Sequence, residues 1–176
     1  MALTSALLLG CLGVGLVIAA ATDVRSGRIP NAITFPLASI GVAVHGITRG
    51  WDGVLFSLEG LAVGLGALLL FYALGGMGAG DVKLLGAVGA VIGPVDVFVA
   101  FLATACFGGL YAISLMMMTW GLPRTAERVR VMMTTWLVTK RFSVGSSSSH
   151  QPNLRYGLAI GLGTLASQAW RLTAGG

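Results

Sequence analysis

The chain consists mostly of long apolar runs that are separated by short polar segments. A helix needs about 20 predominantly apolar residues to cross the hydrocarbon core of a bilayer. Six runs reach or approach this length: residues 3–22, 32–48, 53–74, 82–93, 95–118 and 154–170. The fourth run is too short to span unless it begins in the preceding glycine-rich segment or is partly buried in protein. The pattern predicts an all-α, polytopic membrane bundle of about six transmembrane helices.

Composition narrows the class of protein further. Of 176 residues, 56% are hydrophobic and only 10% are charged, whereas a soluble domain carries about 25% charged residues. So few charges cannot cover a soluble surface, which excludes a soluble globular enzyme, a disordered tail and a disulfide-stapled secreted module. We predict a single integral-membrane domain over residues 1–176.

The basic residues predict the orientation of the bundle. The net charge is +5, and nine of the 11 Lys and Arg residues lie in the first, third and fifth loops. The positive-inside rule places these loops in the cytoplasm and both termini outside. We therefore interpret the charge as a topology signal and expect no nucleic-acid partner. In the fifth loop, residues 123–140 place apolar side chains on one helical face, which favours a cytoplasmic interfacial amphipathic helix over a substrate-binding element.

Two alternatives remain open for the first apolar run. It could be a signal peptide that ends near Ala21, or residues 8–11 could form a lipoprotein cleavage box that ends at Cys11. Both alternatives lack the basic residues that such signals carry in front of their apolar core. We therefore favour an uncleaved first span.

No metal or cofactor is expected. Cys11 and Cys106 lie alone in apolar runs, there is no CxxC pair, and no His/Asp/Glu cluster has metal-ligand spacing. We also expect His45 to lie in the outer half of the second span, far from any nucleophile. On that expectation, no Ser/His/Asp set competes as a catalytic centre.

Two acidic residues, Asp23 and Asp81, abut apolar helices on the predicted cytoplasmic side. An acidic group at the membrane edge is costly to retain and is a functional candidate by default. For Asp23 one alternative stays open, which is that it only neutralises Arg25 or Arg28.

Asp81 follows a glycine-rich segment that starts at residue 75. Such a segment can adopt conformations that other residues resist. A phosphate-binding loop is the rival interpretation, but Lys83 follows the aspartate and no Gly-Lys-Ser/Thr sequence is present. If Asp23 and Asp81 approach each other, they cannot both ionise easily. One would keep a proton as the acid, and the other would be the base that activates water against a peptide carbonyl.

These residues resemble the type IV prepilin peptidases, which are membrane aspartic proteases. Gly78-Ala79-Gly80-Asp81 matches the Gly-x-Gly-Asp signature of the family and is followed by Lys83. Asp23, Arg25 and Ile29-Pro30-Asn31 match the segment around its first aspartate. The resemblance covers nearly the whole chain.

The resemblance implies an aspartic endopeptidase in the bacterial inner membrane, with its catalytic loops in the cytoplasm. Its partners would be the lipid bilayer and a prepilin or pseudopilin substrate, whose N-terminal leader it would remove without a cofactor. Asp23 and Asp81 would be the catalytic pair, and Gly78 and Gly80 would shape the loop that presents Asp81. The candidates for substrate binding or site orientation are Lys83, Arg25 and Arg28.

The sequence also departs from the family. Tyr156-Gly157 is similar to its late aromatic-glycine segment, but Arg155 stands where proline is often found. Larger members also N-methylate the new N-terminus and carry a cytoplasmic insert with paired CxxC motifs. The segment between Asp23 and Asn31 is too short for this insert. We therefore expect no methylation and a likeness to the short peptidases of tight-adherence (Tad/Flp) pilus systems.

Two other hypotheses remain. An intramembrane protease of the presenilin or signal-peptide-peptidase kind shares Gly-x-Gly-Asp, but its first aspartate usually follows Tyr within a span, whereas Thr22 precedes Asp23 here. A non-enzymatic pilus-assembly scaffold or a small proton-coupled transporter would use the aspartates as helix-end salt bridges or as a proton relay.

Overall fold

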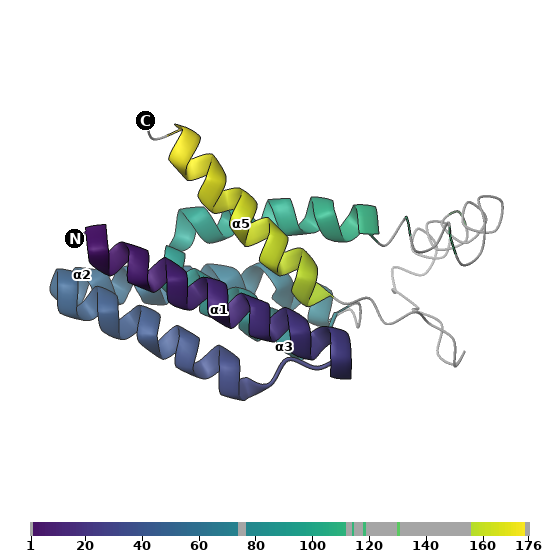
Figure 1. Cartoon of the computed structure of the whole chain (residues 1–176), viewed down its shortest axis with the longest axis horizontal. Helices are drawn as coiled ribbons and strands as arrows, with labels where there is room; N and C mark the ends of the chain where they lie inside the picture. Colours follow the sequence, from purple (N-terminus) through teal and green to yellow (C-terminus); the bar gives the residue numbers. More distant parts are fainter. Residues whose placement is uncertain are drawn as a thin grey trace.

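The computed structural model describes residues 2–73, 77–111 and 156–174, together with the single positions 114, 118 and 130. The regular elements of this described part are all α-helices (Figure 1). They are α1 (Ala2–Ser26), α2 (Asn31–Ala73), α3 (Ala79–Ile92), the helix Pro94–Tyr111 and α5 (Tyr156–Ala174). This confirms an all-α, membrane-like bundle.

Helix α2 is a hairpin of two helical legs. Gly50 interrupts it with φ 62° and ψ −140°, a left-handed conformation that glycine adopts at little cost. Beyond this turn the chain doubles back. This brings the Ser57 hydroxyl to 3.2 Å from the Gly41 carbonyl oxygen, 16 residues earlier. Near the turn, Gly53 packs directly on the His45 carbonyl. The two legs correspond to the second and third apolar runs of the sequence.

Six transmembrane helices are not established by the described residues. Among the described residues, three helices are long and apolar enough to cross a membrane: Ala6–Ser26, Asn31–Ala73 and Pro94–Tyr111. Counting the two legs of α2 separately does not bring the number to six, because α3 has only 14 residues and α5 falls below the same hydropathy criterion. The interfacial helix predicted over residues 123–140 lies outside the described residues except at position 130.

Helix α3 forms the centre of the bundle and contacts α1, α2 and α5. It begins at Ala79, inside the glycine-rich segment, and Leu84, Leu85 and Val88 are fully buried. A helix that is apolar on all sides must be covered on all sides. The legs of α2 provide much of this cover at glycines, where the absence of side chains lets backbones touch. The three positions that do so are Gly41 against Ala90, Gly60 against Gly89 and Gly64 against Leu85.

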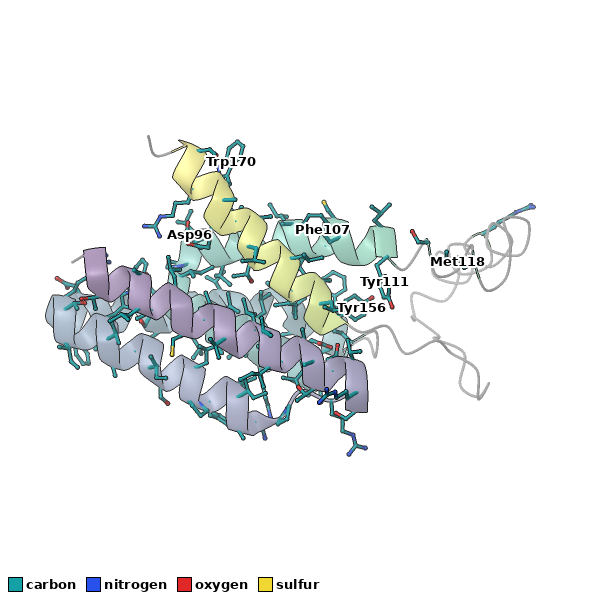
Figure 2. All side chains as sticks on the ribbon, in the orientation of Figure 1. Asp96, Phe107, Tyr111, Met118, Tyr156 and Trp170 are labelled. Atoms are coloured by element: carbon teal, nitrogen blue, oxygen red, sulfur yellow. The ribbon has the colours of Figure 1, made fainter. Side chains whose placement is uncertain are left out.

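The helix ends separate into two groups at opposite ends of the bundle (Figure 1). The end of α1 and the beginnings of α2, α3 and α5 lie together at one end, while the beginning of α1 and the end of α5 lie at the other. At that second end the Arg171 guanidinium pairs with Asp96 at 2.9 Å, which joins α5 to the helix Pro94–Tyr111. Figure 2 shows Asp96 at this end and Tyr156 at the opposite end of α5. The end that contains Tyr156 also contains Asp23 and Asp81.

Candidate active site

Asp23 lies in the last turn of α1 and is only 6% exposed. The helix ends just after it, where Gly27 has φ 63° and donates its N–H to the Asp23 carbonyl oxygen at 2.9 Å. The carboxylate points toward α5, because its Oδ2 accepts a hydrogen bond of 3.0 Å from the Gly157 N–H. This N–H is in the first turn of α5, where the helix dipole favours a negative charge.

Asp81 lies in the first turn of α3 and is 8% exposed. Its N–H donates to the Gly78 carbonyl oxygen at 3.2 Å, and its Oδ2 accepts from the Gly78 N–H at 3.3 Å. The carboxylate therefore caps its own helix. The other oxygen, Oδ1, is buried and has no hydrogen-bond partner in the structure. A buried oxygen without a partner favours the protonated carboxyl group or a bound polar group.

Gly78 and Gly80 of the Gly-x-Gly-Asp signature leave space around Asp81, because they carry no side chain. A Cβ on Gly80 would lie 3.1 Å from the Cβ of Ile29, so the segment after α1 packs directly on the start of α3. A Cβ on Gly78 would lie 3.2 Å from the Oδ2 of Asp81 and would crowd the carboxylate. Gly80 therefore brings the two aspartate-bearing segments together, and Gly78 leaves room for the acid.

The two aspartates interact electrostatically. Asp81 precedes the apolar part of α3 and lies outside the helices long enough to span. Its pKa is raised from 3.8 to about 6, mainly by burial and also by the negative charge of Asp23, and the hydrogen bond from Gly78 opposes this shift. Two neighbouring carboxyl groups, one of which keeps its proton more readily, can act as an acid and a base.

The family model for the type IV leader peptidase family matches residues 10–113, more than half of the chain, including Asp23 and Asp81. The chain belongs to the type IV leader peptidase family. No curated protein and no solved structure matches it significantly. Membership in this family makes the protein a peptidase, and its apolar helices are those of a membrane protein.

The exposed basic residues next to Asp23 do not form ion pairs with it in the described part of the chain. Arg25 and Arg28 are exposed, and within the described part of the chain neither forms an ion pair with Asp23. The alternative in which Asp23 is only a helix-end counter-ion is therefore wrong for the described residues. Lys83 is also exposed and binds elsewhere, since its Nζ donates to Asn31 Oδ1 at 3.1 Å and lies 5.8 Å from the Phe35 ring. It ties α3 to the start of α2.

Tyr156 and Gly157 had no predicted role in the site, yet the structure brings both residues to the two aspartates. The Gly157 N–H binds Asp23, and Tyr156 lies within electrostatic range of Asp81. The Tyr156 ring packs on Gly108, where a Cβ would lie 3.2 Å from Cε1. The sequence offered one signal for this pair, its resemblance to an aromatic-glycine segment of the family. A hydrogen bond from a backbone N–H requires no particular side chain, so the residue type at position 157 could not reveal it.

The expectation that His45 lies far from any nucleophile is wrong. Its Nδ1 lies 3.0 Å from the Ser57 hydroxyl, because the α2 hairpin folds Ser57 back onto the first leg. However, Ser57 is fully buried and its hydroxyl donates to the Ala90 carbonyl oxygen at 2.8 Å. We interpret the hydrogen bond from Ser57 to Ala90 as a structural link between α2 and α3. Among the described residues, no group of three or more His, Cys, Asp and Glu side chains could hold a metal ion.

The raised pKa of Asp81 gives the peptidase a pH-dependent stability. The folded state holds this proton up to about pH 6, whereas the unfolded state releases it near 3.8. Between these values the folded state binds more protons, so the free energy of unfolding falls as pH rises, by at most about 3 kcal/mol. Thermal unfolding in detergent, measured against pH, should show this fall. The fall should disappear in Asp81→Asn. In Asp23→Asn it should end at a lower pH, because without the charge of Asp23 the pKa of Asp81 in the folded state is lower. An unchanged slope in Asp81→Asn would contradict the assignment.

Proposed function

We propose that the protein is a prepilin leader peptidase that cleaves the N-terminal leader of type IV prepilins or pseudopilins at the cytoplasmic membrane face. The observation that carries this proposal is the buried pair itself. Asp23 and Asp81 are both less than one-tenth exposed, lie at the same end of the bundle, and interact electrostatically. Membership in the leader peptidase family supports the same reaction class.

The two carboxyl groups divide the chemistry of peptide hydrolysis. We assign the proton to Asp81, because burial and Asp23 raise its pKa. Asp23, held by the Gly157 N–H, is then the base that takes a proton from water while the oxygen of that water attacks the peptide carbonyl carbon. Asp81 gives its proton to the carbonyl oxygen. When the tetrahedral intermediate collapses, the C–N bond breaks and the leaving amine receives the proton that Asp23 had taken. One hydroxyl of the intermediate becomes the new carbonyl and returns its proton to Asp81, so both carboxyl groups regain their starting states.

The topology that suits this reaction has six spans, with both termini outside and the aspartate end of the bundle in the cytoplasm. In support, the aspartate end holds Arg25, Arg28 and Lys83, which are exposed and basic. Basic residues of this kind are typical of cytoplasmic loops. In this orientation Arg25 and Arg28 are available to contact the substrate, while Lys83 orients α3.

We propose cleavage without methylation. Larger relatives carry a CxxC-containing insert in the first loop, and here only a short segment separates α1, which ends at Ser26, from α2, which begins at Asn31. A substrate of the tight-adherence type fits a peptidase of this short form.

Co-expression tests this function. The peptidase is expressed with small pilin precursors encoded near its gene, and the mature N-terminus is determined by mass spectrometry. We expect a shortened pilin that begins at one defined residue and carries no added methyl group. Uncut precursor in membranes that contain folded peptidase, across the whole panel of precursors, would refute the proposal, and an added methyl group would refute only the absence of methylation.

The Gly157 contact gives a second test of the same site. A Cβ on Gly157 would lie 3.0–3.3 Å from three side-chain atoms of Asp23, so Gly157→Ala must displace the base or the N–H that holds it. Because small misplacements of a catalytic group can cost about a hundredfold, we expect cleavage to slow roughly tenfold to a hundredfold. Gly161→Ala is the matched control, since nothing lies within 4 Å of its Cβ on the same helix. Equal rates for both variants would contradict the role of Gly157.

A further inference from the structure

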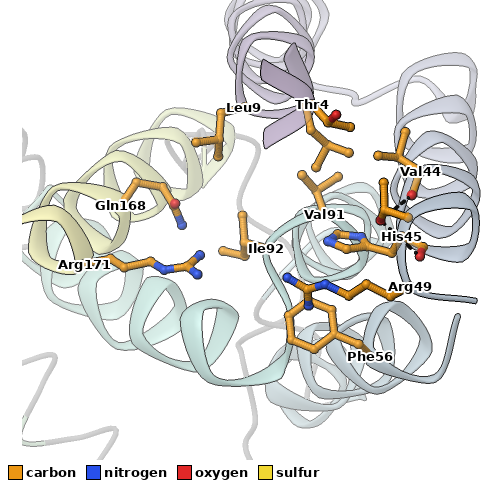
Figure 3. A pocket seen from close by; sticks show the side chains of 12 residues that line it. Thr4, Leu9, Val44, His45, Arg49, Phe56, Val91, Ile92, Gln168 and Arg171 are labelled. Carbon is orange, nitrogen blue, oxygen red and sulfur yellow. Dashed lines mark hydrogen bonds between the residues drawn. The ribbon is translucent and has the colours of Figure 1, made fainter. Parts of the chain in front are cut away.

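A pocket lies at the end of the bundle opposite the aspartates. Its volume is about 140 Å³, and it is lined by residues of α1, α2, α3 and α5 (Figure 3). Thr4 and Leu9 line it from α1, 19 and 14 residues before Asp23 on the same helix. At 1.5 Å per residue these positions lie about 28 and 21 Å along the helix from the first aspartate. Substrate hydrolysis at the aspartate pair therefore does not use it.

The polar lining of the pocket is basic. Figure 3 shows the guanidinium groups of Arg49, from α2, and Arg171, from α5, pointing into the same space. Arg171 is partly neutralised by Asp96 at 2.9 Å. Arg49 lies 5.3 Å from the centre of the Phe56 ring and forms no ion pair with the described residues. Two cations that face one small space, of which only Arg171 is paired with a carboxylate, favour the entry of an anion.

Gln168 adds a donor that lacks an acceptor. Its Nε2 atom is buried and has no hydrogen-bond partner in the structure, and its side chain lines the same pocket. A buried N–H without an acceptor is unfavourable, and an anionic oxygen in the pocket would supply the missing acceptor. Guanidinium groups bind phosphate oxygens through paired N–H donors, and Arg171 uses only one nitrogen on Asp96.

We propose that this pocket binds a negatively charged phosphate group between Arg49, Arg171 and Gln168. The group belongs to a phospholipid headgroup or to free phosphate, which share this chemistry. Helix ends of a membrane bundle lie at headgroup depth, where arginine side chains meet lipid phosphates. The site is independent of the proposed peptidase activity and would anchor the end of the bundle that lies away from the aspartates.

Thermal unfolding of the full-length protein in detergent tests the proposal. One arm adds sodium phosphate against sodium chloride at equal ionic strength, and the other adds phosphatidylglycerol against phosphatidylcholine in mixed micelles. We expect wild type to be stabilised, with affinity about tenfold weaker in Arg49→Gln and in Gln168→Leu. Arg28→Gln is the control, because it removes an equal charge from an exposed position at the opposite end.

The two arms of the experiment distinguish free phosphate from a lipid headgroup, and the variants distinguish lost binding from a folding defect. Stabilisation by both phosphate and phosphatidylglycerol indicates a site open to the free ion, and stabilisation by phosphatidylglycerol alone indicates a headgroup site. Gln168→Leu removes an unsatisfied amide, so its unfolding temperature without ligand should stay equal or rise. A lost response in this variant is then not a folding defect. No stabilisation of wild type in either arm, or equal responses from wild type and both pocket variants, would overturn the proposal.

Discussion

Asp23→Asn and Asp81→Asn should each reduce leader cleavage by roughly 10²–10⁴-fold while the protein remains folded in the membrane. An amide has nearly the shape of a carboxyl group but can neither take the proton from water nor supply one to the carbonyl oxygen. Both aspartates are buried, and neither forms an ion pair within the described part of the chain, so the substitution leaves no cation without its partner. The loss should therefore appear in the rate and not in the amount of protein.

The measurement is the fraction of mature pilin at equal peptidase levels, by mass spectrometry over a time course. Asp52→Asn is the matched control, because Asp52 is exposed and lies just after the Gly50 turn of the α2 hairpin, far from the pair. It should cleave like wild type. Cleavage by all three variants would remove the aspartic mechanism and favour a scaffold, whereas loss in only one of the pair would reassign the second carboxyl group.

Gly60→Ala should destabilise the bundle by about 1–3 kcal/mol, or more if the helices cannot separate. A Cβ at Gly60 would press on the carbonyl group of Gly89 and come within 2.9 Å of the Gly93 Cα. These are backbone atoms, which cannot move aside as a side chain can. The second leg of α2 would have to move away from α3, and the contact that covers the central helix would be lost.

Unfolding in detergent, by heat or denaturant, measures this effect. Gly66→Ala provides the control on the same leg, since Gly66 is exposed and nothing lies within 4 Å of its Cβ. It should be neutral or stabilising by up to about 1 kcal/mol, because alanine favours the helix over glycine. If Gly60→Ala were as stable as Gly66→Ala, the close contact between α2 and α3 would not exist in the protein.

Much of the architecture follows from local patterns. Long apolar runs predicted an all-α membrane bundle because the bilayer penalises any other backbone that is left unsatisfied. The short fourth run was recognised as unable to span alone, and α3 indeed begins in the glycine-rich segment and is buried. The count of six spans stays a prediction, since hydropathy measures only how apolar a segment is and not whether protein or lipid surrounds it.

Part of the candidate site could also be predicted from local sequence patterns. Asp23 and Asp81 could be singled out because charged residues beside apolar helices are rare and costly. The hydrogen-bond donor to Asp23 could not be predicted, because it is the backbone N–H of Gly157, 134 residues away in the chain. The contact between Ser57 and His45 was missed for a related reason, since it depends on how tightly the chain turns at Gly50.

By itself, the sequence determined the class of protein, its apolar segments and the two acidic residues that bear the proposed chemistry, since these depend on composition and on spacing within single segments. Only the tertiary structure decided that α3 lies at the centre, that α5 completes the site, and that Arg49 and Arg171 face one pocket. These relations join residues far apart in the chain. They depend on which distant segments pack against each other, and the spacing within a single segment does not specify this.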